Sequence, residues 1–211
     1  MYFQTLDDKG ECVGVYKNGK LYFQELPEGL TKTWRYAEYL EKDSIEYASL
    51  YCGGLSLGDA CPPYLVDDWL AIENKLKAFY RSFVLAKVNL DENCFFDLVP
   101  KPFLMRYCEI RNKITKYVFE NYEKPKNYDY MLGLTKLLTR IRRQKLNIDV
   151  SSLSKTAHLS KYRQAIKKFS KIDPYCRYNI NGTKTGRLTT QKASFPIMTM
   201  DKDFRSIVRP T

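Results

Sequence analysis

The chain has 211 residues, of which 44% are hydrophobic and 28% charged, and its net charge is +11. This length suits one large domain or two small ones, and no apolar run approaches the roughly 18 residues of a membrane span. The first residues show no signal-peptide pattern, so we expect a globular cytoplasmic protein with no membrane partner.

The charge is unevenly distributed along the chain. Residues 1–100 carry 10 Lys/Arg against 16 Asp/Glu, whereas residues 101–211 carry 25 against 8. A surface that binds an anionic partner is therefore expected in the second half. Six cysteines lie scattered without a CxxC pair, and the only histidine is His158, so we expect reduced cysteines and no zinc site.

The first thirty residues predict a small antiparallel meander. Its strands are expected at residues 2–6, 12–17 and 20–26, with a turn at 7–10. Asn18 and Gly19 suit a type I′ hairpin, because both accept positive φ. Over residues 33–50 the apolar spacing favours one or two short helices, which the pair Gly53-Gly54 would end.

The middle of the chain is typical of helices. Asp67 can cap a helix over residues 67–83, where apolar residues recur every three or four positions. Helices over 103–117 and 131–141, joined by a short link, are expected to pack antiparallel. A shorter basic helix is expected over 160–172.

Basic residues gather on the last two of these helices. Lys136, Arg140 and Arg143 recur at i, i+4 and i+7, nearly opposite the apolar stripe of their helix. Such a run is either a solvated face or a phosphate-binding surface, and both interpretations stay open. The helix 160–172 repeats the pattern with Arg163 and Lys167.

Residues 175–190 read YCRYNINGTKTGRLTT, which has neither helical nor strand periodicity. The segment indicates a turn-rich loop between strands, whose backbone N–H groups and cations, Lys184 among them, suit a phosphate backbone or a base edge. It lacks the spacing of a Walker loop and of a dinucleotide-binding fingerprint.

These patterns together predict an α+β fold. A small N-terminal antiparallel meander is followed by a mainly helical region and then by the start of a sheet. The expected regions are residues 1–65, 66–172 and 173–211.

Residues 185–190, Thr-Gly-Arg-Leu-Thr-Thr, resemble the TGR-L-S/T-S/T motif of family A, polymerase I-like DNA polymerases, and of the phage-type members in particular. Tyr162-Arg163 precedes the motif as a Tyr-Arg helix does in that family, and residues 203–210 resemble its lead-in to the first catalytic aspartate. The resemblance implies an N-terminal accessory region, a thumb-like region at 66–172 and an incomplete first palm segment at 173–211.

The resemblance also implies roles for single residues. Arg187 would reach into the minor groove at the primer terminus, where hydrogen-bond acceptors sit at similar places in all correct base pairs. Thr185, Gly186 and Thr189 would support close approach of the backbone to the duplex, and Arg205 would lie near the active site. The full set of expected DNA contacts is Thr185, Gly186, Arg187, Thr189, Lys136, Arg140, Arg143, Arg163, Lys167 and Lys184.

Two departures from the family pattern limit this interpretation. Residues 194–200, Ser-Phe-Pro-Ile-Met-Thr-Met, stand where the family has Pro-Asn-Leu-Gln-Asn-Ile-Pro. The family's metal-binding aspartates and nucleotide-binding lysine and tyrosine would all follow Thr211. We therefore expect no catalytic or metal-binding residue here, Mg²⁺ bound by residues outside this chain, and Asp201 and Asp203 in a turn.

The leading interpretation is the N-terminal part of a DNA-directed DNA polymerase, a nucleotidyltransferase of DNA replication. Its partners would be primer–template DNA, deoxynucleoside triphosphates in the complete enzyme, and a C-terminal polymerase portion or second polypeptide. The alternative is a non-catalytic DNA-binding module that retains a polymerase-like grip on the duplex. A basic helical protein whose TGR match is accidental also stays open.

Overall fold

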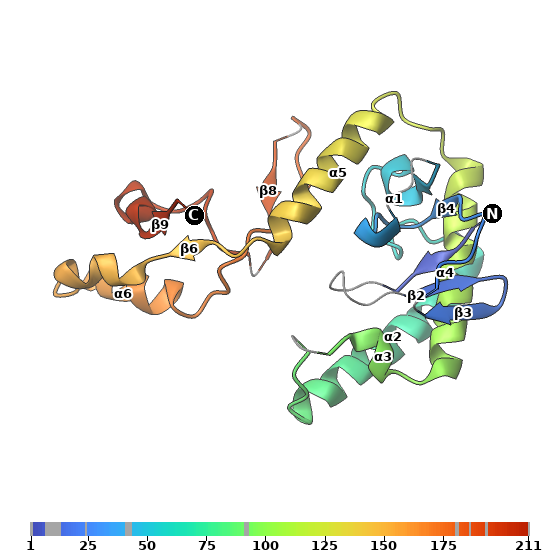
Figure 1. Ribbon diagram of the computed structural model, residues 1–211, viewed down its shortest axis with the longest axis horizontal. Helices are drawn as coiled ribbons and strands as arrows, with labels where there is room; N and C mark the ends of the chain where they lie inside the picture. The colour runs from blue at the N-terminus through green and yellow to red at the C-terminus, as the bar shows by residue number, and fades with distance from the viewer. Residues whose placement is uncertain are drawn as a thin grey trace. The chain divides into compact units, whose positions relative to one another are not determined.

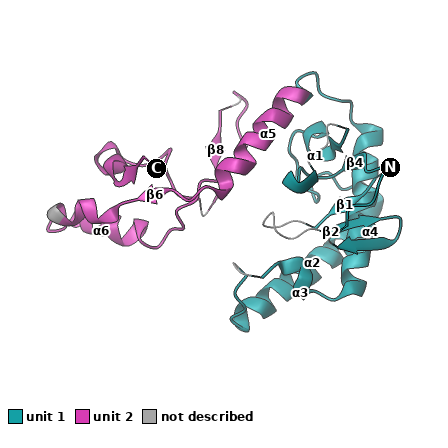
Figure 2. Ribbon diagram, in the orientation of Figure 1, with its two compact units in different colours: residues 1–128 teal, residues 129–211 magenta. Residues whose placement is uncertain are grey.

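The computed structural model describes residues 2–6, 14–23, 25–40, 44–90, 93–179, 182–185, 187–192 and 194–210. The fold is mixed α+β, with about 49% helix and 13% strand, as the sequence predicts. The chain divides into two compact units, residues 1–128 and 129–211, which are shown in different colours in Figure 2. These units differ from the three predicted regions, and the polymerase-like assignment of those regions stays a prediction.

The first unit contains the predicted antiparallel meander (Figure 1). Its strands are β1 (Gln4–Thr5), β2 (Gly14–Lys17) and β3 (Lys20–Phe23), in the order β1-β2-β3. Asn18 and Gly19 have φ values of 51° and 76°, so the predicted hairpin turn between β2 and β3 is confirmed. The predicted turn at 7–10 lies outside the described residues.

Residues 33–50 are less helical than the sequence predicts. β4 (Lys32–Thr33) pairs in parallel with β5 (Glu46–Tyr47), and the helical parts are the 3-10 turn η1 (Glu38–Leu40) and α1 (Ala48–Tyr51). Of the buried apolar residues here, Leu40 lies on η1 and Ala48 and Leu50 lie on α1. Trp34, Ala37 and Ile45 are buried outside any helix or strand, so the apolar spacing reflects burial rather than a continuous helix. Gly53 and Gly54, with φ values of 65° and 80°, follow α1 as expected.

Three further α-helices of the first unit lie among the described residues. They are α2 (Val66–Leu85), which follows the 3-10 turn η2 (Pro63–Leu65), then α3 (Phe95–Leu98) and α4 (Lys101–Asn121). Asp67 does not cap α2, because Leu65 occupies the N-cap position and no side chain caps the helix. Asp67 lies in the first turn instead, where a carboxylate still stabilises the positive end of the helix dipole.

Aromatic packing joins α2 to α4 in one core. The ring centroids of Trp69 and Tyr107 are 6.4 Å apart, and those of Phe79 and Phe103 are 5.0 Å apart. The same core includes Leu6 of the N-terminal segment. The predicted boundary after residue 65 therefore crosses a continuous core, because α2 buries its apolar face together with the residues that precede it.

A buried polar contact ties β1 to α4. The side chain of Gln4 is fully buried, and its Nε2 donates a hydrogen bond to Thr115 Oγ1 at 2.7 Å and another to Asn112 Oδ1 at 3.0 Å. Gln4 thus contacts two residues of α4 that lie more than a hundred positions away in sequence, and these contacts hold the sheet on the helix.

The cysteines differ from the expectation of six reduced thiols. Cys94 is disulfide-bonded, whereas Cys52, Cys61, Cys108 and Cys176 are free. Burial raises the pKa of Cys108 to about 12, so that thiol stays protonated at neutral pH. The buried free cysteines, Cys52, Cys108 and Cys176, behave as small apolar core residues.

The second unit contains two helices of eight or more residues, α5 (Tyr128–Arg143) and α6 (Ser160–Phe169), among the residues described; α5 begins one residue before the unit boundary. The 3-10 helices η3 (Val150–Thr156) and η4 (Lys202–Ile207) accompany them. β6 (Asn147–Ile148) pairs with β9 (Val208–Arg209), and β7 (Tyr178–Asn179) pairs with β8 (Thr189–Thr190), both antiparallel. Since α4 and α5 belong to different units, their antiparallel packing stays a prediction.

The core of the second unit explains the unusual segment 194–200. Phe195 is completely buried, and its ring lies 5.8 Å from that of Phe169 on α6. Met200 is buried in the same core as Phe204 of η4. Apolar residues stand in this segment because they fill the core of the unit.

A helix that spans a bilayer must be both long and apolar. Across the described ranges, no helix is both long enough and apolar enough to span a bilayer.

Candidate nucleic-acid interface

The motif 185–190 belongs to a β-hairpin of the second unit. β7 and β8 pair Tyr178 with Thr190 and Asn179 with Thr189. The ladder continues toward the core, because Gln191 N–H donates to Arg177 O at 2.8 Å and Phe195 N–H donates to Tyr175 O at 2.9 Å. Residues 182–185, 187 and 188, which lie between the two strands in sequence, are therefore at the end of the hairpin away from the buried Phe195.

The backbone at Arg187 is held while its side chain is exposed. Thr183 Oγ1 donates a hydrogen bond to the carbonyl oxygen of Arg187 at 3.0 Å. Lys184 and Thr185, in the same connection, are also exposed. Gly186 lies outside the described residues. The structure thus brings three of the predicted contact residues, Lys184, Thr185 and Arg187, together at one end of one hairpin.

Thr189 has a different environment from the other motif residues. It is half-buried on β8, and its Oγ1 accepts a hydrogen bond from Asn179 Nδ2 at 3.5 Å. A Cβ atom at Gly182 would collide with the same Oγ1. The hydroxyl of Thr189 therefore lies inside the hairpin, where a glycine at position 182 leaves room for it.

The basic residues of α5 lie opposite a partly buried stripe. Leu138 is buried, Lys136 is half-buried, and Arg140 and Arg143 are exposed. Arg140, Arg142 and Arg143 occupy the last turn, where cations also stabilise the negative end of the helix dipole. The exposed cations have the spacing that the sequence predicts, and this geometry fits both a solvated face and a phosphate-binding face.

The two basic residues singled out on α6 are not equivalent. Arg163 Nε donates to Ala157 O at 3.4 Å, and its Nη2 donates to His158 O at 3.5 Å. Its guanidinium group thus binds carbonyl oxygens at the end of η3. Lys167 is exposed and lies on the side of α6 away from the buried Ala165 and Phe169.

Asp201 and Asp203 lie at the start of η4, in a turn as expected, and both contact one lysine. Lys161 Nζ is 2.9 Å from Asp201 Oδ2 and 2.7 Å from Asp203 Oδ2. These hydrogen bonds raise the pKa of Lys161 and, on the other side of the pair, lower the pKa of Asp201. Arg205 is exposed in the same turn, and its Nε donates to Met200 O at 3.4 Å.

This arrangement does not fit a magnesium ion. Mg²⁺ is held by carboxylates and water in octahedral geometry, whereas here an ammonium group lies between the two carboxylates. In the part of the chain that the structure describes, no group of three or more His, Cys, Asp or Glu residues is placed to hold a metal. The expectation that Mg²⁺ would be bound by residues outside this chain stays a prediction.

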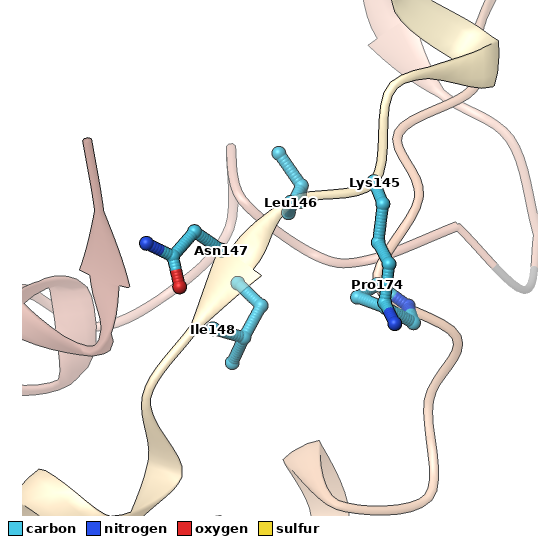
Figure 3. A pocket seen from close by; sticks show the side chains of 5 residues that line it. All are labelled: Lys145, Leu146, Asn147, Ile148 and Pro174. Carbon is cyan, nitrogen blue, oxygen red and sulfur yellow. The ribbon is translucent and has the colours of Figure 1, made fainter. Parts of the chain in front are cut away.

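One pocket of the second unit has a volume of about 420 Å³. Figure 3 shows its lining by Lys145, Leu146, Asn147, Ile148 and Pro174. Among the described residues of this lining, Lys145 is the only ionisable one, so these residues supply no acid–base pair. It contains none of the predicted contact residues.

The second unit is strongly basic. Residues 129–211 carry 18 Lys/Arg against five Asp/Glu, a net charge of +13. Two further exposed cations, Arg177 and Lys192, flank the β7–β8 hairpin and were not singled out from the sequence. Their position directly outside the two strands is the signal that could have identified them.

Comparisons with protein families, curated proteins and solved structures find no match to this chain.

Proposed function

We propose that this chain binds primer–template DNA, as the N-terminal part of a DNA polymerase that resembles family A. The observation that carries the proposal is the TGR motif at the exposed end of the β7–β8 hairpin. There the Arg187 side chain is exposed, and Thr183 fixes the backbone carbonyl of the same residue.

The chemistry of arginine suits the proposed contact. Its planar guanidinium group presents several N–H donors in a fixed arrangement. The acceptors of the minor groove, purine N3 and pyrimidine O2, lie at similar positions in correct pairs. Arg187 would therefore recognise the geometry of a correct terminal base pair and not the identity of its bases.

The surrounding charge supports a duplex as the partner. The second unit has a net charge of +13, and exposed cations lie on α5, on α6 and on the hairpin. Cations of this kind bind phosphates by releasing condensed counterions, which gives affinity without sequence preference. In this proposal Lys136, Arg140, Arg143 and Lys167 bind phosphates, while Arg163 chiefly stabilises α6.

Nucleotide addition would need groups that the described residues do not supply. Transfer of a nucleotidyl group by a polymerase uses carboxylates that hold two Mg²⁺ ions, and Asp201 and Asp203 are occupied by Lys161. In the complete enzyme, a C-terminal polymerase portion or second polypeptide would provide the carboxylates and bind the deoxynucleoside triphosphates. We assign no chemical step to this chain.

The Lys161 ion pairs also favour a second candidate function. A non-catalytic DNA-binding module needs the hairpin and the basic helices but no metal site. The two candidates share the binding step and differ in nucleotide addition. Primer extension by this chain together with the polymerase portion that it would require distinguishes them, because only a polymerase part restores extension.

Replacing Arg187 tests the binding step. We expect Arg187→Ala to weaken binding to a primer–template junction by about 1–3 kcal/mol, the range for a base-edge contact, with a smaller loss on blunt duplex. The control is Lys192→Ala, which removes an exposed cation beside the hairpin but outside the motif. The control should weaken both DNAs equally, as a phosphate contact does.

Fluorescence anisotropy with labelled junction and duplex at one salt concentration gives both affinities. If Arg187→Ala lowers the affinity for the junction and for the blunt duplex equally, the proposed contact between Arg187 and the junction is wrong.

A further inference from the structure

Gly133 lies in the middle of α5, and none of the described residues requires a glycine there. Glycine is among the least favourable residues in a helix interior. Gly133 is not among the glycines with positive φ, and a Cβ atom at this position would meet no atom within 4 Å. Neither backbone conformation nor internal packing therefore explains the residue.

The face of α5 that contains Gly133 is exposed and has a mixed character. Tyr130, Gly133, Leu137 and Arg140 follow one another at intervals of three, four and three residues, so they share one side of the helix. Tyr130 is 70% exposed and Leu137 is 54% exposed. Lys136 and Arg143 adjoin this face on one side.

The charge of the face identifies the partner. Arg140 lies on the face and Lys136 and Arg143 adjoin it, whereas Asp129 in the first turn is the acidic residue of this helix, so the face carries a net positive charge. A partner that complements it carries regularly spaced negative charge. Glycine allows such a partner to approach the helix backbone more closely than any residue with a Cβ atom does.

We propose that the sugar–phosphate backbone of a bound duplex lies against α5 at Gly133. Lys136 and Arg140 then bind the phosphates on either side of the contact, and Tyr130 and Leu137 cover the apolar faces of the deoxyriboses. This inference rests on the proposed function, because it names the place on α5 where the duplex comes closest.

The test compares Gly133→Ala with Thr139→Ala in the full chain. Both changes introduce alanine into α5, so both should raise the melting temperature. Thr139 is six residues further along the helix, where it lies off the Gly133 face. Only Gly133→Ala should weaken binding to a labelled blunt duplex, by about three- to tenfold, roughly the loss of one phosphate contact. Gly133→Leu should weaken it further.

Each other outcome overturns the inference. An unchanged duplex affinity in Gly133→Ala and Gly133→Leu would show that nothing approaches the helix there. A lower melting temperature in Gly133→Ala, with Thr139→Ala raised, would show that the glycine serves a contact within the protein. If the wild-type chain does not bind the duplex at all, the proposed function fails as well, so the two failures are distinguishable.

Discussion

Arg187 and Arg163 are both exposed arginines, but their hydrogen bonds give them different roles. The guanidinium group of Arg163 donates to the carbonyl oxygens of Ala157 and His158. At Arg187 the hydrogen bond from Thr183 involves the backbone carbonyl instead of the side chain. Exposure alone therefore does not identify a binding arginine, and the partners of each guanidinium group decide the assignment.

A matched pair on α6 tests this distinction. Arg163→Ala should lower the free energy of unfolding by about 0.5–1.5 kcal/mol, because two carbonyl oxygens lose their donor. Lys167→Ala, on the same helix, should change it by less than about 0.5 kcal/mol. Urea denaturation followed by circular dichroism measures both. Equal effects of the two substitutions on stability would contradict a stabilising role for the Arg163 hydrogen bonds.

Lys161 makes stability depend on pH at the acid end. A hydrogen bond from Lys161 lowers the pKa of Asp201 below its usual 3.8. The folded state therefore favours the ionised form of this carboxylate more than the unfolded state does. This contribution is fully present above pH 3.8 and is lost as the pH falls through the lowered value. We expect Lys161→Met to be less stable than the wild type at neutral pH, with the difference shrinking below pH 3.8.

Thermal unfolding across the acid range measures that difference. A gap between wild type and Lys161→Met that stays constant well below pH 3.8 would contradict the ion-pair account. The raised pKa of Lys161 adds no change between neutral pH and its usual value of 10.5, because the ammonium form persists there in both states.

At the scale of elements, the segment 194–200 contributes buried residues to the core of the second unit. Phe195 is completely buried, whereas Met198, three residues later, is 58% exposed. Phe195→Ala should therefore lower the free energy of unfolding by about 3–5 kcal/mol, the usual cost of removing a buried phenyl ring. Met198→Ala should have little effect. Comparable losses in the two variants would contradict the assignment of Phe195 to the core.

Local elements could be predicted from the sequence, and pairings between distant segments could not. Asn18-Gly19 predicts its hairpin because the turn depends on two adjacent residues. The β4–β5 and β6–β9 pairs were missed because each strand has two residues and a partner far away in sequence. Asp67 failed as a cap because η2 runs directly into α2.

The candidate site follows the same rule. The spacing of Lys136, Arg140 and Arg143 could be read from the sequence, since one helix carries all three. The contact of Lys161 with Asp201 and Asp203 depends on how α6 and η4 pack in the second unit, which no local pattern specifies. Gly133 belongs to no sequence motif, and its open surroundings became evident only in the structure.

At the scale of the whole molecule, the two compact units differ in charge. Residues 1–128 carry 17 Lys/Arg against 19 Asp/Glu, a net charge of −2, whereas residues 129–211 have a net charge of +13. The proposed binding of DNA therefore belongs to the second unit. The first unit has its own buried core, which includes Trp69 and Tyr107.

This asymmetry predicts the salt dependence of binding. Replacing Lys136, Arg140 and Arg143 together by alanine should reduce the slope of log affinity against log salt by about 2–3, since each phosphate contact contributes about 0.9. The control removes three exposed cations from α2 in the first unit, Lys75, Lys77 and Arg81. Titrations at several salt concentrations give both slopes. An unchanged slope in the first variant would assign the α5 cations to a solvated face.

The most direct test of the central claim is the affinity of the wild-type chain for a primer–template junction and for a blunt duplex of equal length at one salt concentration. Binding through the hairpin and the basic helices predicts that the chain binds both DNAs and prefers the junction, because Arg187 adds a base-edge contact to the shared phosphate contacts. Equal affinity for the two DNAs, or no binding to either, would contradict the account.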